Sequence, residues 1–87
     1  MTTATATVRN ELGLHARPAA LFVQLATRFA SDIVLAKNGV EVNGKSIMGV
    51  MMLAAERGSK LEVRASGADE EQAVAQLTSL IEKGFDE

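Results

Sequence analysis

The sequence predicts a small α+β domain built as a two-layer open-faced sandwich, in which three helices cover one face of a four-stranded antiparallel sheet. Three observations lead to this prediction. Four segments have strand-like patterns, and one of them is apolar only at alternate positions, so one sheet face should meet solvent. Three other segments have helical periodicity or helix caps and would cover the opposite face. Residues 1–87 contain no linker or repeat, and they are expected to form a single domain.

The first strand and the first helix are predicted from two different periodicities. Threonine alternates with alanine or valine over residues 2–9, so Ala4, Ala6 and Val8 are expected to point into the core. After a short loop, a helix is predicted over residues 17–30. Its inner face combines apolar residues at helical spacing, namely Phe22, Leu25, Ala26 and Phe29.

A β-hairpin is predicted in the middle of the chain. Residues 33–37 and 40–42 have the composition of strands, and Asn38 and Gly39 separate them. Asn-Gly readily adopts the positive φ values that a two-residue turn needs. A second Asn-Gly pair, at positions 43–44, is expected to end the second strand.

A short apolar helix of one or two turns is predicted within residues 47–53. Ser46 is a favourable N-cap residue, and Gly49 weakens the helix and limits its length. Three of the four methionines of the chain lie here. They could fill gaps in the core, or they could stay exposed as an adaptable docking surface.

The last strand is predicted over residues 60–65, with Leu61, Val63 and Ala65 on its inner face. A final helix should follow and end near residues 83–84.

The start of the final helix is predicted from a capping box. Asp69 and Gln72 have the spacing of such a box, in which two side chains satisfy free backbone N–H groups. Glu70 and Glu71 suit the positive end of the helix dipole, which explains this acidic pair better than catalysis does. The inner stripe of the helix consists of Ala73, Val74, Leu77, Leu80 and Ile81.

The composition argues against several classes of protein. A net charge of −2, no basic run and no Trp or Tyr argue against nucleic-acid binding. Without cysteine and with one histidine, the chain lacks thiolate chemistry and an imidazole-rich metal site, so we expect no metal and no cofactor. No stretch is long enough to span a bilayer, and residues 1–10 do not resemble a signal peptide. We therefore expect a cytoplasmic protein without membrane insertion.

The only histidine of the chain lies in the motif Gly-Leu-His-Ala-Arg-Pro at residues 13–18. Pro18 suits the first turn of a helix, so His15 should lie just before the helix, where free N–H groups favour an anion. Arg17 adds a guanidinium suited to binding phosphate. This pattern indicates a histidine that is itself phosphorylated, although a lone histidine here could also be an ordinary surface or capping residue.

The whole chain resembles the histidine-containing phosphocarrier family, HPr, of the bacterial phosphoenolpyruvate-dependent sugar phosphotransferase system. The resemblance rests on three motifs at residues 13–19, 43–51 and 66–71. The run Lys-Ser-Ile-Met-Gly-Val-Met, which ends the second motif, is similar to the Gram-positive-like branch. Leu12 departs from the family pattern, because many members have a small polar residue there that helps to organise the loop.

The resemblance implies a monomeric phosphoryl carrier that is not a stand-alone catalyst. His15 would accept a phosphoryl group on Nδ1 from phosphorylated enzyme I and pass it to a sugar-specific enzyme IIA, while Arg17 helps to hold or release the group. HPr kinase/phosphorylase would phosphorylate Ser46, and a catabolite-control transcription regulator would bind that form. The resemblance also implies a partner-binding set, which consists of Ala20, Leu21, Ile47, Met48, Met51 and Met52.

Three alternatives to the carrier remain. A regulatory relative could act mainly through Ser46, although relatives dedicated to that role typically lack the active histidine. A hydrolase with a histidine nucleophile is disfavoured, because the sequence offers no evident orienting carboxylate, metal cluster or phosphate loop. In a pure interaction module, the methionine-rich segment would matter and His15 would be incidental.

Overall fold

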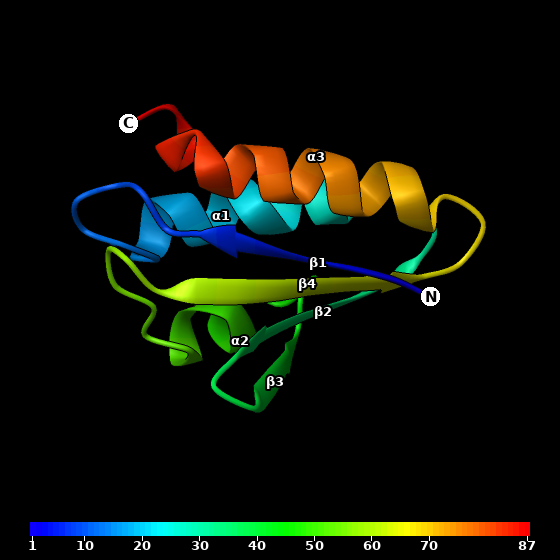
Figure 1. Cartoon of the computed structure of the whole chain (residues 1–87), viewed down its shortest axis with the longest axis horizontal. Helices are drawn as coiled ribbons and strands as arrows, with labels where there is room; N and C mark the ends of the chain where they lie inside the picture. Colours follow the sequence, from blue (N-terminus) through cyan, green and yellow to red (C-terminus); the bar gives the residue numbers. More distant parts are fainter.

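The computed structural model describes residues 1–87 and confirms the two-layer sandwich and the predicted order of elements. Those elements are β1 (Thr2–Thr7), α1 (Ala16–Ala26), β2 (Asp32–Lys37), β3 (Val40–Asn43), α2 (Ile47–Met52), β4 (Lys60–Ser66) and α3 (Glu70–Glu82). The four strands pair antiparallel in the order β1-β4-β2-β3. Helices α1 and α3 run side by side along the sheet, and α2 packs against α1 and β3 (Figure 1).

The core lies between the sheet and the helices, as the alternating pattern of β4 predicts. Leu61, Val63 and Ala65 are buried, and the register places Leu61 opposite Ala6 and Val63 opposite Leu35. The outward-facing side of β4 is polar, and there Arg64 pairs with carboxylates of β3 and β4. Burial of one face only is what an open-faced sandwich requires.

The β2–β3 hairpin confirms the turn prediction. Asn38 and Gly39 have φ values of 51° and 83°, the left-handed conformation that a type I′ turn demands at both positions. Lys37 and Val40 close the turn as a cross-strand pair.

Helix α1 is shorter than predicted. Its regular part ends at Ala26. The N–H groups of Arg28 and Phe29 donate to carbonyls three residues earlier, which is the hydrogen-bond pattern of a 3-10 turn. Phe29 nevertheless stays buried, so the apolar periodicity identified its inward direction correctly. No helix of the structure is long and apolar enough to cross a membrane.

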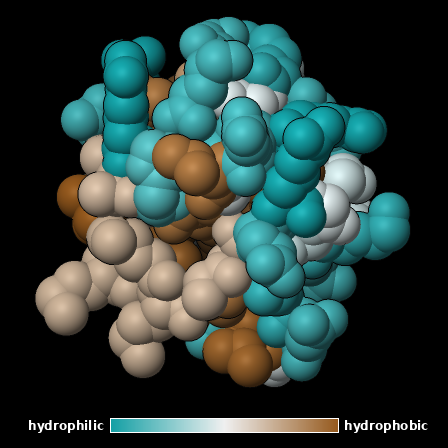
Figure 2. Space-filling model, turned by 90° about the vertical axis from the view of Figure 1, so that its left-hand side faces the viewer, coloured by the Kyte–Doolittle hydropathy of each residue, from teal (hydrophilic) through white to brown (hydrophobic).

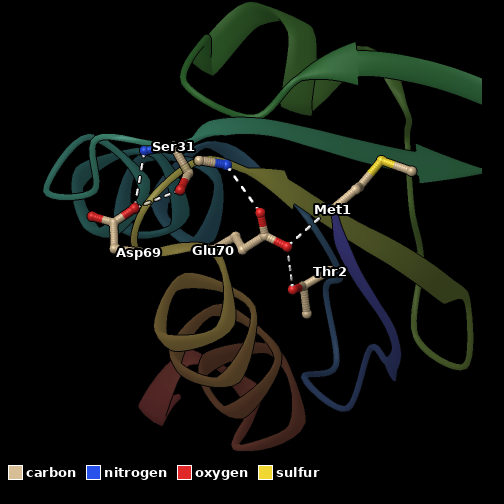
Figure 3. A network of polar contacts seen from close by, with 6 residues as sticks. Met1, Thr2, Ser31, Asp69 and Glu70 are labelled. Atoms are coloured by element: carbon tan, nitrogen blue, oxygen red, sulfur yellow. Dashed lines mark hydrogen bonds and ion pairs between the residues drawn. The ribbon is translucent and has the colours of Figure 1, made fainter.

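The predicted capping box at the start of α3 is wrong. The Asp69 carboxylate does not cap its own helix, and instead accepts hydrogen bonds from the Ser31 N–H and the Ser31 hydroxyl (Figure 3). It also accepts a hydrogen bond from the Ala30 N–H. The Ser31 hydroxyl is the main reason why the pKa of the Asp69 carboxyl is lowered, and the Ala30 N–H adds to the effect. Asp69 therefore binds the segment after α1 and does not form the expected capping box with Gln72.

Glu70 ties the start of α3 to the first strand. Its carboxylate accepts from Thr2 Oγ1 at 2.6 Å and from the Gly67 N–H at 3.1 Å, and it lies 2.9 Å from the Met1 ammonium (Figure 3). These contacts, the Thr2 hydroxyl first, lower the pKa of Glu70 from 4.5 to about 2. Its role here is structural, which agrees with the rejection of a catalytic acidic pair.

A 3-10 turn at Gly84–Asp86 follows α3 and was not predicted. Phe85 adopts φ 57° within it, an uncommon conformation for an aromatic residue, and is buried in the core. Burial of a large aromatic ring offsets the cost of this backbone conformation. The turn directs Glu87 back toward the N-terminal end of α1.

Candidate functional site

His15 is the N-cap residue of α1, as the position of Pro18 predicts. Its carbonyl accepts the Ala19 N–H at 3.0 Å, while its side chain makes no capping hydrogen bond. The imidazole is about one-third exposed, with a side-chain accessibility of 36%. It therefore lies beside the free N–H groups of the first turn, at the positive end of the helix dipole.

Glu87 is a neighbour of the histidine that sequence reasoning missed. Its Oε2 lies 3.2 Å from His15 Nε2, so the expectation that no carboxylate orients the imidazole is wrong. A carboxylate at Nε2 favours the tautomer that carries its proton there, which leaves the lone pair of Nδ1 free. No signal in the sequence marks this contact, because the two residues are 72 positions apart.

Asn10 connects Glu87 with the loop that precedes His15. Its Nδ2 donates to the Gly13 carbonyl at 2.6 Å and to Glu87 Oε1 at 3.2 Å, while its Oδ1 has no hydrogen-bond partner. Asn10 is only 6% exposed. The loop is thus organised by Asn10, while Leu12, which departs from the family pattern, is exposed to solvent. An Asn three residues before a Gly is a turn signal that could have identified Asn10.

The loop is also pressed against the segment that follows α2. The Leu14 N–H donates to the Ala55 carbonyl at 2.8 Å. Gly13 has φ 68°, and a Cβ there would lie 2.3 Å from the same carbonyl oxygen. Only glycine meets both requirements, which explains its place in the motif.

The side chain of Arg17 is exposed and makes no hydrogen bond or ion pair with another residue of the chain. Its guanidinium is therefore available to an anion at the helix terminus. A surface hollow of about 450 Å³ lies along β2 and β3 and includes neither His15 nor Arg17. Because the imidazole is about one-third exposed and Arg17 is exposed, another macromolecule can approach the histidine site.

Ser46 is the N-cap residue of α2, as predicted, and its Oγ accepts the Gly49 N–H at 3.1 Å. The helix that it caps buries Val50. No group of three or more His, Cys, Asp or Glu residues is arranged to hold a metal ion.

The methionines of α2 do not fill gaps in the core. We define the α2 patch as the exposed apolar side chains of this helix: Ile47 (44% exposed), Met48 (76%), Met51 (41%) and Met52 (77%). Ala20 and Leu21 are half-buried on α1, which packs beside α2. Figure 2 views the molecule from the left-hand side of Figure 1. Hydrophobic side chains, drawn in tan and brown, gather at the lower left of this view.

Comparisons with known proteins identify the family of the chain. A family model described as "PTS HPr component phosphorylation site" matches residues 2–83. Phosphocarrier protein HPr of Neisseria meningitidis serogroup A is 51% identical over 78 residues, which cover 90% of this chain and 88% of that protein. HPr-like protein Crh of Bacillus subtilis is 50% identical over 76 residues, 87% of this chain and 89% of that protein. The crystal structure of HPr-C-His from Thermoanaerobacter tengcongensis superposes with a TM-score of 0.95 at 48% identity, covering 100% of this chain and 98% of that one.

Proposed function

The chain belongs to the HPr family of phosphocarrier proteins of the phosphotransferase system, and on that premise we propose that it relays a phosphoryl group through a phosphohistidine at His15. Members of this family are phosphocarriers and not stand-alone catalysts. The donor in this proposal is phosphorylated enzyme I, and the acceptor is a sugar-specific enzyme IIA domain.

The observation that supports this proposal best is the environment of His15. Glu87 lies at Nε2, so the Nδ1 lone pair is free to attack phosphorus. The new N–P bond forms as the bond between phosphorus and the donor breaks, and the reverse exchange delivers the group to the acceptor. The helix terminus and Arg17 balance the charge of the phosphoryl group, while each partner supplies the rest of the transfer machinery.

The proposed docking surface combines the α2 patch with Ala20 and Leu21. An exposed apolar surface of this kind is suited to a protein partner. Because His15 and Ser46 are the N-cap residues of the neighbouring helices α1 and α2, one docking surface could serve transfer and regulation together. We further propose that the protein acts as a monomer in the cytoplasm, which size-exclusion chromatography and cell fractionation test.

A second, regulatory function is favoured by the similarity to HPr-like protein Crh and by the placement of Ser46. In this proposal HPr kinase/phosphorylase transfers phosphate from ATP to Ser46 Oγ, and a catabolite-control transcription regulator binds the product. A phosphate at an N-cap position is compatible with the helix, but it adds charge beside the α2 patch. Phosphorylation would therefore preserve the fold and hinder docking to enzyme I.

A labelling experiment tests the carrier function. The protein is incubated with enzyme I and phosphoenolpyruvate labelled in its phosphoryl group, and the label on the protein is then exposed to acid and to base. We expect a label that is lost in acid, kept in base and absent from His15→Ala. The Ser46→Ala variant is the matched control and should still take up the label. Absence of label from the unaltered protein would contradict the proposal.

The regulatory function has its own test. With ATP and the kinase, we expect an acid-stable label that is absent from Ser46→Ala. The Ser46→Asp variant should accept phosphoryl groups from enzyme I more slowly than the unaltered protein. Equal rates would show that charge at this position does not affect docking.

A further inference from the structure

Three exposed methionines lie on the surface that we propose for docking. Met51 and Met52 follow Met48 by three and four positions, so both are neighbours of Met48 on one side of α2. Because the chain has no cysteine, Trp or Tyr, methionine thioethers are its only sulfur groups and its most readily oxidised ones. We propose that Met48, Met51 and Met52 form a reversible oxidation site that switches docking off, an inference that rests on the proposed carrier function.

The oxidant belongs to the peroxide class. A sulfur lone pair attacks one peroxide oxygen, an S–O bond forms and the O–O bond breaks. With hydrogen peroxide, each thioether is oxidised to a sulfoxide and the peroxide is reduced to water. Methionine sulfoxide reductases, which draw electrons from thiols, restore the thioether and release the oxygen as water.

The fold does not depend on these three side chains. From this helix, the core receives Val50, followed by Leu53 just beyond it, and both are buried. The N-cap bond of the helix joins Ser46 to Gly49. Oxidation therefore changes the surface and leaves the core and the helix cap untouched.

The docking surface does depend on them. Met48 and Met52 are about three-quarters exposed, and Met51 is 41% exposed, so all three residues are open to a small oxidant and available to a partner. A sulfoxide oxygen is a strong hydrogen-bond acceptor, and burying it against an apolar partner surface without a donor is costly. Oxidation converts an apolar docking surface into a polar one.

Met1 provides an internal control. It is 79% exposed, and it lies at the N-terminus, on the opposite side of Figure 1 from α2. Its oxidation should not affect docking. A Met1→Leu background removes it, so that every oxygen gained by that protein reports the α2 methionines.

The experiment compares Met1→Leu with a variant that carries Met48→Leu, Met51→Leu and Met52→Leu in addition. Leucine keeps the apolar character and nearly the volume of methionine, but it has no sulfur. Both proteins are treated with hydrogen peroxide, and the sites and number of added oxygens are mapped by mass spectrometry. Thermal unfolding, binding to immobilised enzyme I and the kcat/KM of phosphoryl acceptance are then measured.

For Met1→Leu we expect three added oxygens, an unchanged melting temperature, and losses of about tenfold in both binding and kcat/KM. Methionine sulfoxide reductases should restore both. The leucine variant should be unaffected by the same treatment.

Full activity with three sulfoxides, an equal loss in the leucine variant, or unfolding on oxidation would each overturn the inference. If untreated protein binds enzyme I but takes up no label, the carrier function is contradicted. The change in binding to enzyme I on oxidation then still tests the oxidation site. If untreated protein neither binds nor takes up label, both proposals are overturned.

Discussion

At the scale of single residues, the histidine site depends on two side chains outside the motif that identifies it. Asn10 holds the loop through the Gly13 carbonyl, and it also donates to Glu87, whose carboxylate lies at His15 Nε2. A histidine at a helix terminus is free to rotate unless a second group orients it. Here Glu87 orients the ring and Asn10 orients Glu87.

Replacing Asn10 with alanine removes both donors. The buried Gly13 carbonyl then loses its partner, so the free energy of unfolding should fall by about 1–3 kcal/mol. Phosphoryl acceptance from enzyme I should also slow, because Glu87 is less constrained. Urea unfolding measures the first effect and labelling kinetics the second. Glu11→Ala, an exposed change in the same loop, is the matched control and should alter neither.

Replacing Glu87 with alanine tests the tautomer directly. At a pH where the imidazole is neutral, ¹⁵N shifts of His15 in the unaltered protein should report a proton on Nε2 and a lone pair on Nδ1. In Glu87→Ala the shifts should move toward a mixture of the two tautomers. Asp86→Ala, which changes the exposed neighbour, should keep the original shifts. Identical shifts in all three proteins would mean that Glu87 does not select the tautomer.

At the scale of elements, two carboxylates at the start of α3 bind other segments of the chain. Asp69 binds the segment after α1, and Glu70 binds the beginning of β1. Both residues belong to the start of α3, where sequence patterns alone assign them to capping and helix electrostatics. Their tertiary partners make this region sensitive to acid.

Glu70 should contribute a specific part of the acid sensitivity. Its folded pKa, about 2, lies below its ordinary value of 4.5. The stability that it contributes is therefore complete above about pH 4.5 and is lost as pH falls toward 2. Glu70→Gln should unfold more easily than the unaltered protein at pH 7, and the difference should shrink at pH 2–3. Urea unfolding at both pH values measures this, with Glu71→Gln, an exposed neighbour, as the control.

At the scale of the whole molecule, the C-terminal turn closes the core and also completes the site. Phe85 is buried from this turn, and Glu87, two residues later, reaches His15. Glu87 therefore reaches the histidine because one aromatic ring anchors the turn. The burial of Phe85 and the contact between Glu87 and His15 therefore depend on the same turn.

Phe85→Ala should lower the free energy of unfolding by about 3–5 kcal/mol, because it empties a large core position. Phe85→Leu, which keeps much of the volume, should lose less. Chemical denaturation of both variants measures the difference. If the alanine variant were as stable as the unaltered protein, Phe85 would not anchor the turn.

Most of the fold could be predicted because its elements follow from local patterns. The alternation in β4, the Asn38–Gly39 turn and the capping by Ser46 each depend on residues within about four positions, and all three are confirmed. The end of α1 was missed, because a tightening turn interrupts the helix while its apolar periodicity continues. The hydrogen-bond partners of Asp69 could not be predicted, because they lie 38 and 39 positions away in the sequence.

By itself, the sequence determined the sandwich, the place of His15 and Ser46 at two helix starts, and the resemblance to a phosphocarrier family. The tertiary structure alone decided that Glu87 meets His15, that Phe85 is buried in a left-handed turn, and that the α2 methionines stay exposed. The physical reason is the separation along the chain of the residues that determine each feature. Periodicity and capping depend on neighbours along the chain, whereas exposure and long-range pairing depend on which surfaces the finished core leaves uncovered.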